Sequence, residues 1–314
     1  MTDVSREIFE AYHVRKSKKQ KAAFREYICG ELEKAGYAPK TEKKGSSCNV
    51  VVGDAEKAKL LFTAHYDTCA MLPFPNFITP RNMIFYLLYQ ILICIPIFAL
   101  AFGAEVLVLA VWKEAPLWAA MAVTYAVLIF CIWWLLDGPA NRHTANDNTS
   151  GTLTLVEIAL TLPEKLRDKV CFVFFDNEEK GMLGSSAFVK MHKETKESAY
   201  CINFDCVSDG NSIQFYPAKE LKKDENFLRL LEESFPAQGE KNAEVVRAFG
   251  FYPSDQKCFK RGVGVCALKK KPLIGYYMDR IHTRKDTVLD EKNLELLRVG
   301  AIALAEKMNE SKEN

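Results

Sequence analysis

Residues 170–185 read Val-Cys-Phe-Val-Phe-Phe-Asp-Asn-Glu-Glu-Lys-Gly-Met-Leu-Gly-Ser, and this stretch decides the predicted fold. Its first six residues are apolar or aromatic, and the acidic residues Asp176, Glu178 and Glu179 follow at once. A short apolar run of this kind indicates a buried strand. Open α/β sheets bind ligands just beyond the carboxyl ends of their strands, so we expect a functional site at these acidic residues. The same pattern also fits the acidic first turn of a helix.

Two other predicted strands also end on polar residues. The strand over residues 58–64 runs into His65-Tyr-Asp67, and the strand over residues 200–204 ends at Asp205. Residues two apart in a strand share a face, so Asp67 can accept the second ring N–H of His65 and fix its tautomer.

Two further ligand-type residues lie on loops. Asp147 comes just before a helix predicted over residues 152–162, where an ordinary helix cap is the alternative role. His282 follows the strand predicted over residues 263–268. Both side chains can reach the same edge of the sheet as the strand ends.

The ligand-type residues therefore form one ordered set. In chain order they are His65, Asp67, Asp147, Glu178, Glu179, Asp205 and His282. Because the ends of parallel strands converge on one rim, we expect these side chains to meet. Two histidines and three carboxylates, one of them shared, suit two divalent cations. Mixed nitrogen and oxygen ligation favours Zn²⁺, with Co²⁺ or Mn²⁺ as alternatives.

The composition excludes some classes of protein. The 314 residues include 42 Lys and Arg against 40 Asp and Glu, a net charge of +2, which argues against nucleic-acid binding driven by bulk charge. The ten cysteines form no C-x-x-C pair, so they indicate buried thiols in a reducing compartment. The N-terminal residues lack an apolar signal-peptide core, so we do not expect export.

Two apolar stretches interrupt this pattern, at residues 83–112 and 117–136. Each is long enough to cross a bilayer as a helix, and the four residues between them suit a tight hairpin. Tryptophans near the ends of both stretches are typical of membrane interfaces. We therefore predict a hairpin over residues 83–137, with residues 83–136 in contact with lipid. A soluble hairpin that serves as a dimer arm or covers the catalytic domain is the alternative.

The hairpin is predicted to be an insertion within one discontinuous domain, residues 1–82 and 138–314. Arg81 and Arg142 flank it on the same side, so we expect the catalytic domain to face the cytoplasm. Near the N-terminus we predict one helix over residues 5–36. Its basic cluster around Arg15 and Lys21 fits either a solvated helix face or attraction to an anionic membrane.

The sequence resembles the M28 family of zinc aminopeptidases. The motifs that carry the resemblance are Ala64-His65-Tyr-Asp67, Asn146-Asp147-Asn-Thr-Ser-Gly151, Glu178-Glu179-Lys-Gly-Met-Leu-Gly-Ser185, Ile202-Asn-Phe-Asp205 and Ile281-His282-Thr-Arg-Lys-Asp-Thr287. The resemblance covers most of residues 20–68 and 140–308. It implies an α/β fold with a mixed, mostly parallel central sheet flanked by helices. The inserted two-helix transmembrane hairpin, predicted above from the residues, is a departure from that family.

The resemblance also implies a role for each residue of the set. His65 and Asp205 would bind one zinc ion, Glu179 and His282 the other, and Asp147 would bridge both. Asp67 would orient His65, and Glu178 would be the general base. The implied function is a two-metal aminopeptidase acting on peptides with a free N-terminus. A one-zinc glutaminyl cyclase and a non-catalytic scaffold with this fold are the alternatives.

Overall fold

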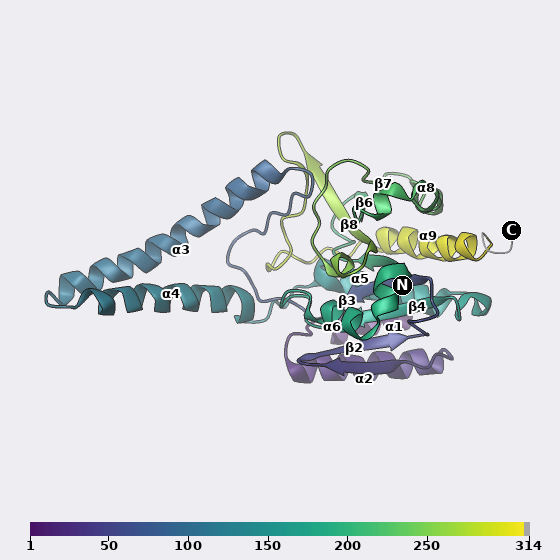
Figure 1. Cartoon of the computed structure of the whole chain (residues 1–314), viewed down its shortest axis with the longest axis horizontal. Coiled ribbons are helices and arrows are strands. Elements are labelled where there is room, and N and C mark those ends of the chain that lie inside the picture. Colours follow the sequence, from purple (N-terminus) through teal and green to yellow (C-terminus); the bar gives the residue numbers. More distant parts are fainter. Residues whose placement is uncertain (311–314) are drawn as a thin grey trace.

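The computed structural model describes residues 1–310 of the chain (Figure 1). Its strands are β1 (Lys40–Lys44), β2 (Ser47–Val52), β3 (Leu60–His65), β4 (Val170–Phe175), β5 (Tyr200–Phe204), β6 (Ser212–Pro217), β7 (Asn242–Val245), β8 (Arg261–Lys271) and β9 (Gly275–Tyr277). Its α-helices are α1 (Asp3–Ala11), α2 (Lys18–Lys34), α3 (Met83–Val111), α4 (Leu117–Asp137), α5 (Gly151–Thr161), α6 (Leu183–Met191), α7 (Lys193–Ser198), α8 (Glu225–Ser234) and α9 (Glu291–Glu310). Strands and helices alternate over much of the chain, as in α/β proteins.

The strands form one mixed sheet in the order β1-β2-β4-β3-β5-β8-β6-β7, with β9 paired to β8. The central strands β4, β3, β5 and β8 run parallel, and antiparallel pairs such as β1 with β2 flank them. Parallel central strands are buried on both faces, which explains why β4 is apolar throughout. The predicted fold class is confirmed.

The core lies on both faces of this sheet. In β4, Phe172 and Phe174 pack into one hydrophobic cluster, which contains residues of α1, α2, α5, α8 and α9. Cys171, Val173 and Phe175 face the other way, into a smaller cluster that includes Phe188 and Val189 of α6. Because side chains alternate along a strand, one short apolar run contributes to two layers.

The parallel register brings three chain segments to one rim of the sheet. In the register of β3 and β4, His65 pairs with Phe175, the last residue before the acidic loop. Thr63 of β3 pairs with Asn203 of β5, so the two strands end close together and Asp205 follows directly. The helical turn Ala145–Ser150 reaches this rim through Asn148, whose side-chain amide donates to the Phe204 carbonyl oxygen at 3.0 Å.

The N-terminal region differs from the single predicted helix. Helix α2 begins after Ser17, whose hydroxyl accepts the backbone N–H of Gln20, while the Gln20 side chain accepts the N–H of Ser17. This reciprocal capping separates α2 from α1. The solvated basic face was also a wrong expectation for two members of the cluster: Arg15 is fully buried, and the Lys21 ammonium lies 2.7 Å from an Asp176 oxygen.

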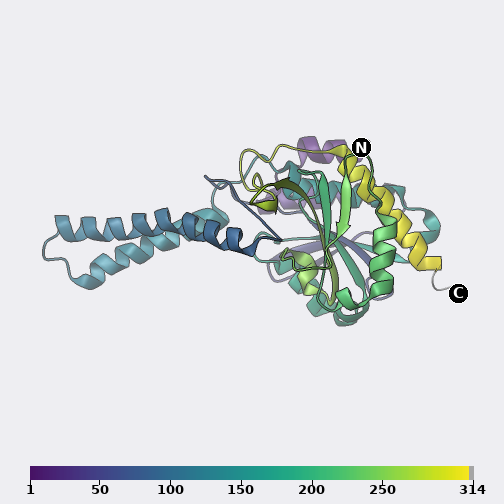
Figure 2. The same cartoon turned by 90° about the horizontal axis from the view of Figure 1, so that it is seen from above.

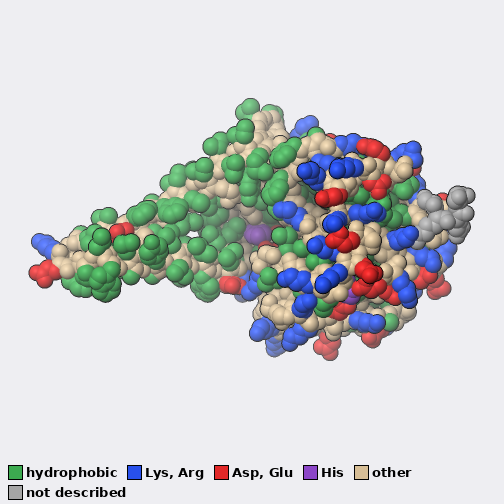
Figure 3. Space-filling model, in the orientation of Figure 1, with side chains coloured by type: hydrophobic (Ala, Val, Ile, Leu, Met, Phe, Trp, Pro, Cys, Tyr) green, Lys and Arg blue, Asp and Glu red, His purple; other side chains and the backbone are tan. Residues whose placement is uncertain are grey.

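Helices α3 and α4 project from the body as one arm (Figures 1 and 2). With a rise of 1.5 Å per residue they are about 43 and about 31 Å long, and a bilayer core is about 30 Å thick. Only 6 % and 11 % of their most apolar windows are buried inside the protein. Figure 3 shows their surface as almost continuously hydrophobic, with charged side chains at the tip. Both helices are long and apolar enough to cross a membrane.

The arm is joined to the body at both bases. Helix α3 begins at Asn82, whose side chain caps the Phe85 N–H and donates to the Ile274 carbonyl oxygen at 3.0 Å. Helix α4 ends at Asp137, whose carboxylate lies 2.9 Å from the Lys180 ammonium. Lys180 directly follows the glutamate pair, so the base of α4 contacts the acidic loop.

Candidate metal centre

The first half of the site is a histidine between two aspartates. The Nε2 atom of His65 lies 3.5 Å from an Asp147 oxygen and 3.5 Å from an Asp205 oxygen. All three side chains are buried, with at most 8 % of any of them exposed. They come from the end of β3, the turn before α5 and the residue that follows β5.

The second half lies on the other side of Asp147. The Nε2 atom of His282 is 2.9 Å from the second oxygen of Asp147 and 3.3 Å from an oxygen of Glu179. One carboxylate oxygen of Asp147 thus faces each histidine. His282 is 24 % exposed, so the site is more open on this side. In Figure 3 a histidine surface is visible in the notch between the arm and the body.

These distances fit a pair of zinc ions. Zn–N and Zn–O bonds are about 2.1 Å long, so two ligands of one tetrahedral ion lie about 3.4 Å apart. The ring nitrogens and carboxylate oxygens described above are 2.9–3.5 Å apart. Among the described residues, the Oε1 atom of Glu179 is buried and has no hydrogen-bond partner. Burial raises the pKa of Glu179 to about 8. A cation would supply the missing partner and offset this cost.

Asp67 connects His65 to the glutamate pair. Its carboxylate accepts the backbone N–H of Glu178 at 2.9 Å and that of Glu179 at 3.3 Å. The Nδ1 atom of His65 is 3.1 Å from the backbone oxygen of Asp67 and 3.6 Å from its carboxylate. The sequence predicted a hydrogen bond from His65 to the Asp67 carboxylate, whereas the ring nitrogen lies closer to the Asp67 backbone oxygen. The two amide contacts add a second task, because Asp67 also fixes the loop that carries the glutamates.

Burial and neighbouring charges shift the pKa values of Glu178 and His282. Burial raises the pKa of Glu178 well above its ordinary value, although His65 opposes the shift. A carboxyl group with a raised pKa can take up a proton near neutral pH. Burial alone would lower the pKa of His282, but Glu179 and Asp147 raise it to about 9.

Two supporting residues were missed by the sequence reasoning. Asp286 accepts the backbone N–H groups of Asn146 and Asp147 at 2.7 and 2.9 Å, so it holds the turn that presents Asp147. Its position four residues after His282 was the available signal. Arg15 lies behind the site and donates to the backbone oxygen of Tyr66. Burial lowers the pKa of Arg15 to about 10, against the attraction of Asp67.

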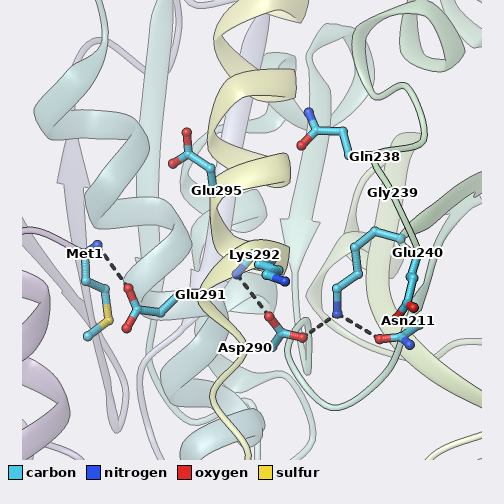
Figure 4. A pocket seen from close by; sticks show the side chains of 10 residues that line it. Met1, Asn211, Gln238, Gly239, Glu240, Asp290, Glu291, Lys292 and Glu295 are labelled. Atoms are coloured by element: carbon cyan, nitrogen blue, oxygen red, sulfur yellow. Dashed lines mark hydrogen bonds and ion pairs between the residues drawn. The ribbon is translucent and has the colours of Figure 1, made fainter.

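Two hollows lie outside the ligand set. One, of about 330 Å³, adjoins His282 and is lined by residues 71–75, Asp279 and residues 283–285. The other, of about 880 Å³, lies at the N-terminal end of α9 (Figure 4). There the Lys241 ammonium contacts Asp290 and lies 2.8 Å from the Asn211 side-chain oxygen. None of the seven predicted site residues lines either hollow.

Comparison with known proteins finds a matching family model and several similar solved structures. The family model described as Peptidase family M28 matches residues 132–306. The LapA aminopeptidase of Legionella pneumophila has a TM-score of 0.59 at 14 % identity, over 97 % of this chain and 70 % of that chain. No match is found among curated proteins.

Two glutaminyl cyclases have equally similar structures. The enzyme of Porphyromonas gingivalis has a TM-score of 0.59 at 16 % identity, over 97 % of this chain and 96 % of that chain. The enzyme of Macrostomum lignano has a TM-score of 0.60 at 12 % identity, over 98 % and 89 %. At these identities the likeness shows the fold alone, and it is shared by aminopeptidases and glutaminyl cyclases.

Proposed function

Because this chain belongs to peptidase family M28, we propose that it is a two-metal aminopeptidase that removes N-terminal residues from peptides. One zinc ion would be held by His65, Asp147 and Asp205, and the other by Asp147, Glu179 and His282. Co²⁺ or Mn²⁺ are the alternative metals. The observation that carries the proposal is the Asp147 carboxylate, which turns one oxygen towards each histidine.

The protein groups divide the chemical work. When bound, the metal pair lowers the pKa of a water molecule and polarises the scissile carbonyl group. Glu178 takes the proton of that water and passes it to the leaving amine. The Asp67 carboxylate holds Glu178 in place by accepting the Glu178 backbone N–H, and Asp286 holds the turn that presents Asp147. The hollow beside His282 provides room for the substrate chain.

The alternative is a glutaminyl cyclase, which needs one zinc ion. Two structural neighbours of that activity support it. A peptidase would need His65 and Asp205 for an additional metal, and His65 lies 3.5 Å from an oxygen of Asp147 and 3.5 Å from an oxygen of Asp205, which favours the peptidase. A non-catalytic scaffold would bind no metal. The metal content of the purified protein therefore distinguishes the peptidase, the cyclase and the scaffold.

We also propose that α3 and α4 span a membrane, with residues 83–136 in lipid and the catalytic domain in the cytoplasm. The exposed apolar side chains of both helices support this, since residues such as Val111 and Trp118 are 79 % and 72 % exposed. Protease treatment of intact cells would test the orientation. Cleavage of the catalytic domain from outside would refute it.

The decisive experiment combines metal analysis with a substrate panel. The protein is purified in detergent, its zinc content is measured, and it is assayed with aminoacyl amides and with an N-terminal glutaminyl peptide. Glu178→Gln should keep two zinc ions and lose most turnover, because the amide cannot accept the proton. Glu164→Gln, on an exposed turn, is the matched control and should be fully active. Full activity of Glu178→Gln, or cyclisation without hydrolysis, would refute the proposal.

A further inference from the structure

A cysteine thiol lies beside the second metal position. Candidate ligand atoms of Cys69, Glu179 and His282 all lie within 4.8 Å of one another. Cys69 is two residues beyond Asp67, on the segment that follows β3, and only 1 % of it is exposed. The ligand set expected from the sequence contains histidine and carboxylate groups only, so this thiol has no role in it.

The backbone around Cys69 is held on two sides. Its carbonyl oxygen accepts the backbone N–H of Asn141 at 3.2 Å, and the next residue, Ala70, forms an antiparallel bridge with Ala140. The Asn141 side-chain amide donates to the Thr283 carbonyl oxygen at 3.0 Å. One short ladder therefore fixes the thiol to the loop that carries His282.

Glu179 supplies a second, independent sign of a ligand at this position. Its Oε1 atom is buried and lacks a hydrogen-bond partner among the described residues, while its other oxygen faces His282. An unpaired oxygen and charged groups around a buried thiol cost free energy unless a cation binds between them. Thiolate is a strong ligand for zinc, with a Zn–S bond of about 2.3 Å.

We propose that Cys69, as its thiolate, is a fourth protein ligand of the metal held by Asp147, Glu179 and His282. The thiol proton is released to solvent when the metal binds, as for other cysteine ligands. The second position then has four protein donors, which is typical of closed zinc sites. The first position has only His65, Asp147 and Asp205, so it keeps a place for water. The inference rests on the metal pair of the proposed function.

Cobalt substitution tests this ligand directly, because a thiolate bound to Co²⁺ gives a near-ultraviolet charge-transfer band. The full-length protein in detergent is loaded with Co²⁺, and bound cobalt is counted alongside the spectrum. We expect the band in the wild type and its loss in Cys69→Ser. Cys206→Ala is the matched control, since the Cys206 sulfur lies 3.1 Å from an Asp205 oxygen at the other half of the site. This variant should keep the band.

The possible outcomes separate this inference from the proposed function. Two bound cobalt ions without a band, or a band that persists in Cys69→Ser, would overturn the cysteine ligand and leave the metal pair intact. One bound ion with the band would support the cysteine and overturn the two-metal count. No bound ion would overturn both. If Cys69→Ser does not fold, zinc-edge X-ray absorption of the wild type decides, and the absence of a sulfur neighbour at about 2.3 Å would refute the ligand.

Discussion

Replacement of Asp67 by alanine should damage the site without removing a metal ligand. The carboxylate of Asp67 accepts the backbone amides of Glu178 and Glu179 at 2.9 and 3.3 Å, and only 5 % of the side chain is exposed. Alanine cannot accept either hydrogen bond. The glutamate loop would lose its attachment to the end of β3, and both glutamates would move relative to His65.

The expected size of the effect follows from these two hydrogen bonds. A hydrogen bond to a charged group contributes about 1.5–3 kcal/mol, so two contribute about 3–6 kcal/mol. We expect the free energy of unfolding to fall by about 3 kcal/mol, the lower end of this range. The bond to Glu179 is the longer of the two, and water can enter the space that the carboxylate leaves. Loss of a residue that orients metal ligands lowers metal affinity about 10–100-fold. That factor corresponds to about 1.4–2.7 kcal/mol of binding free energy.

Zinc competition against a chelator measures the affinity, and hydrolysis of an aminoacyl amide measures the activity. Asp67→Asn should give an intermediate loss, because one amide oxygen still accepts while the NH₂ group opposes the second donor. Asp224→Ala is the control for general destabilisation, since Asp224 accepts the Phe227 N–H and the Tyr200 hydroxyl far from the proposed metal positions. Wild-type zinc affinity and turnover in Asp67→Ala would refute the reasoning.

Three further changes should have distinct effects. Asp147→Ala should abolish binding of both metals, and an unchanged zinc content would contradict the shared ligand. Gly151→Ala should lower stability and activity, because a Cβ there would lie 2.2 Å from the carbonyl oxygen that ends β5; a melting temperature equal to the wild type would count against this. Burial lowers the pKa of His192, but hydrogen bonds with Glu42 and Glu56 outweigh burial and raise this pKa. The stabilisation relative to His192→Gln, at most about 1 kcal/mol for a group that is only partly buried, should be full below about pH 6.5 and should vanish as pH rises through the folded pKa. Denaturation curves that differ equally at all pH values would exclude it.

The strand ends, and the polar residues that stand at them, were predictable because each depends on local sequence. A buried apolar run such as residues 170–175 specifies a parallel strand, and its last residue marks the rim. His65 ends one such run and Asp205 follows another directly, and the structure brings these two side chains to within 3.5 Å of each other. The two apolar helices were also predictable, since their length and hydropathy depend on no other part of the chain.

The supporting residues were harder to predict, because their surroundings come from distant segments. Arg15 looks like part of a solvated basic cluster until β3 and the turn before α5 close around it, where it donates to Thr149 at 3.2 Å. Lys21 is paired only because α2 lies against the end of β4. Cys69 resembles any other small buried residue, and its neighbours Glu179 and His282 are more than a hundred positions away.

The place of the arm in the chain has a consequence for biosynthesis. His65 leaves the ribosome before the two apolar helices, and the other four proposed ligands leave after them. During synthesis the N-terminal part of a chain emerges first and can fold first. A metal that binds only the folded site cannot bind before the last ligand has emerged. If the proposed function and the proposed membrane span both hold, a nascent chain that is still being inserted would carry no active hydrolase, and hydrolysis would begin only after insertion is complete.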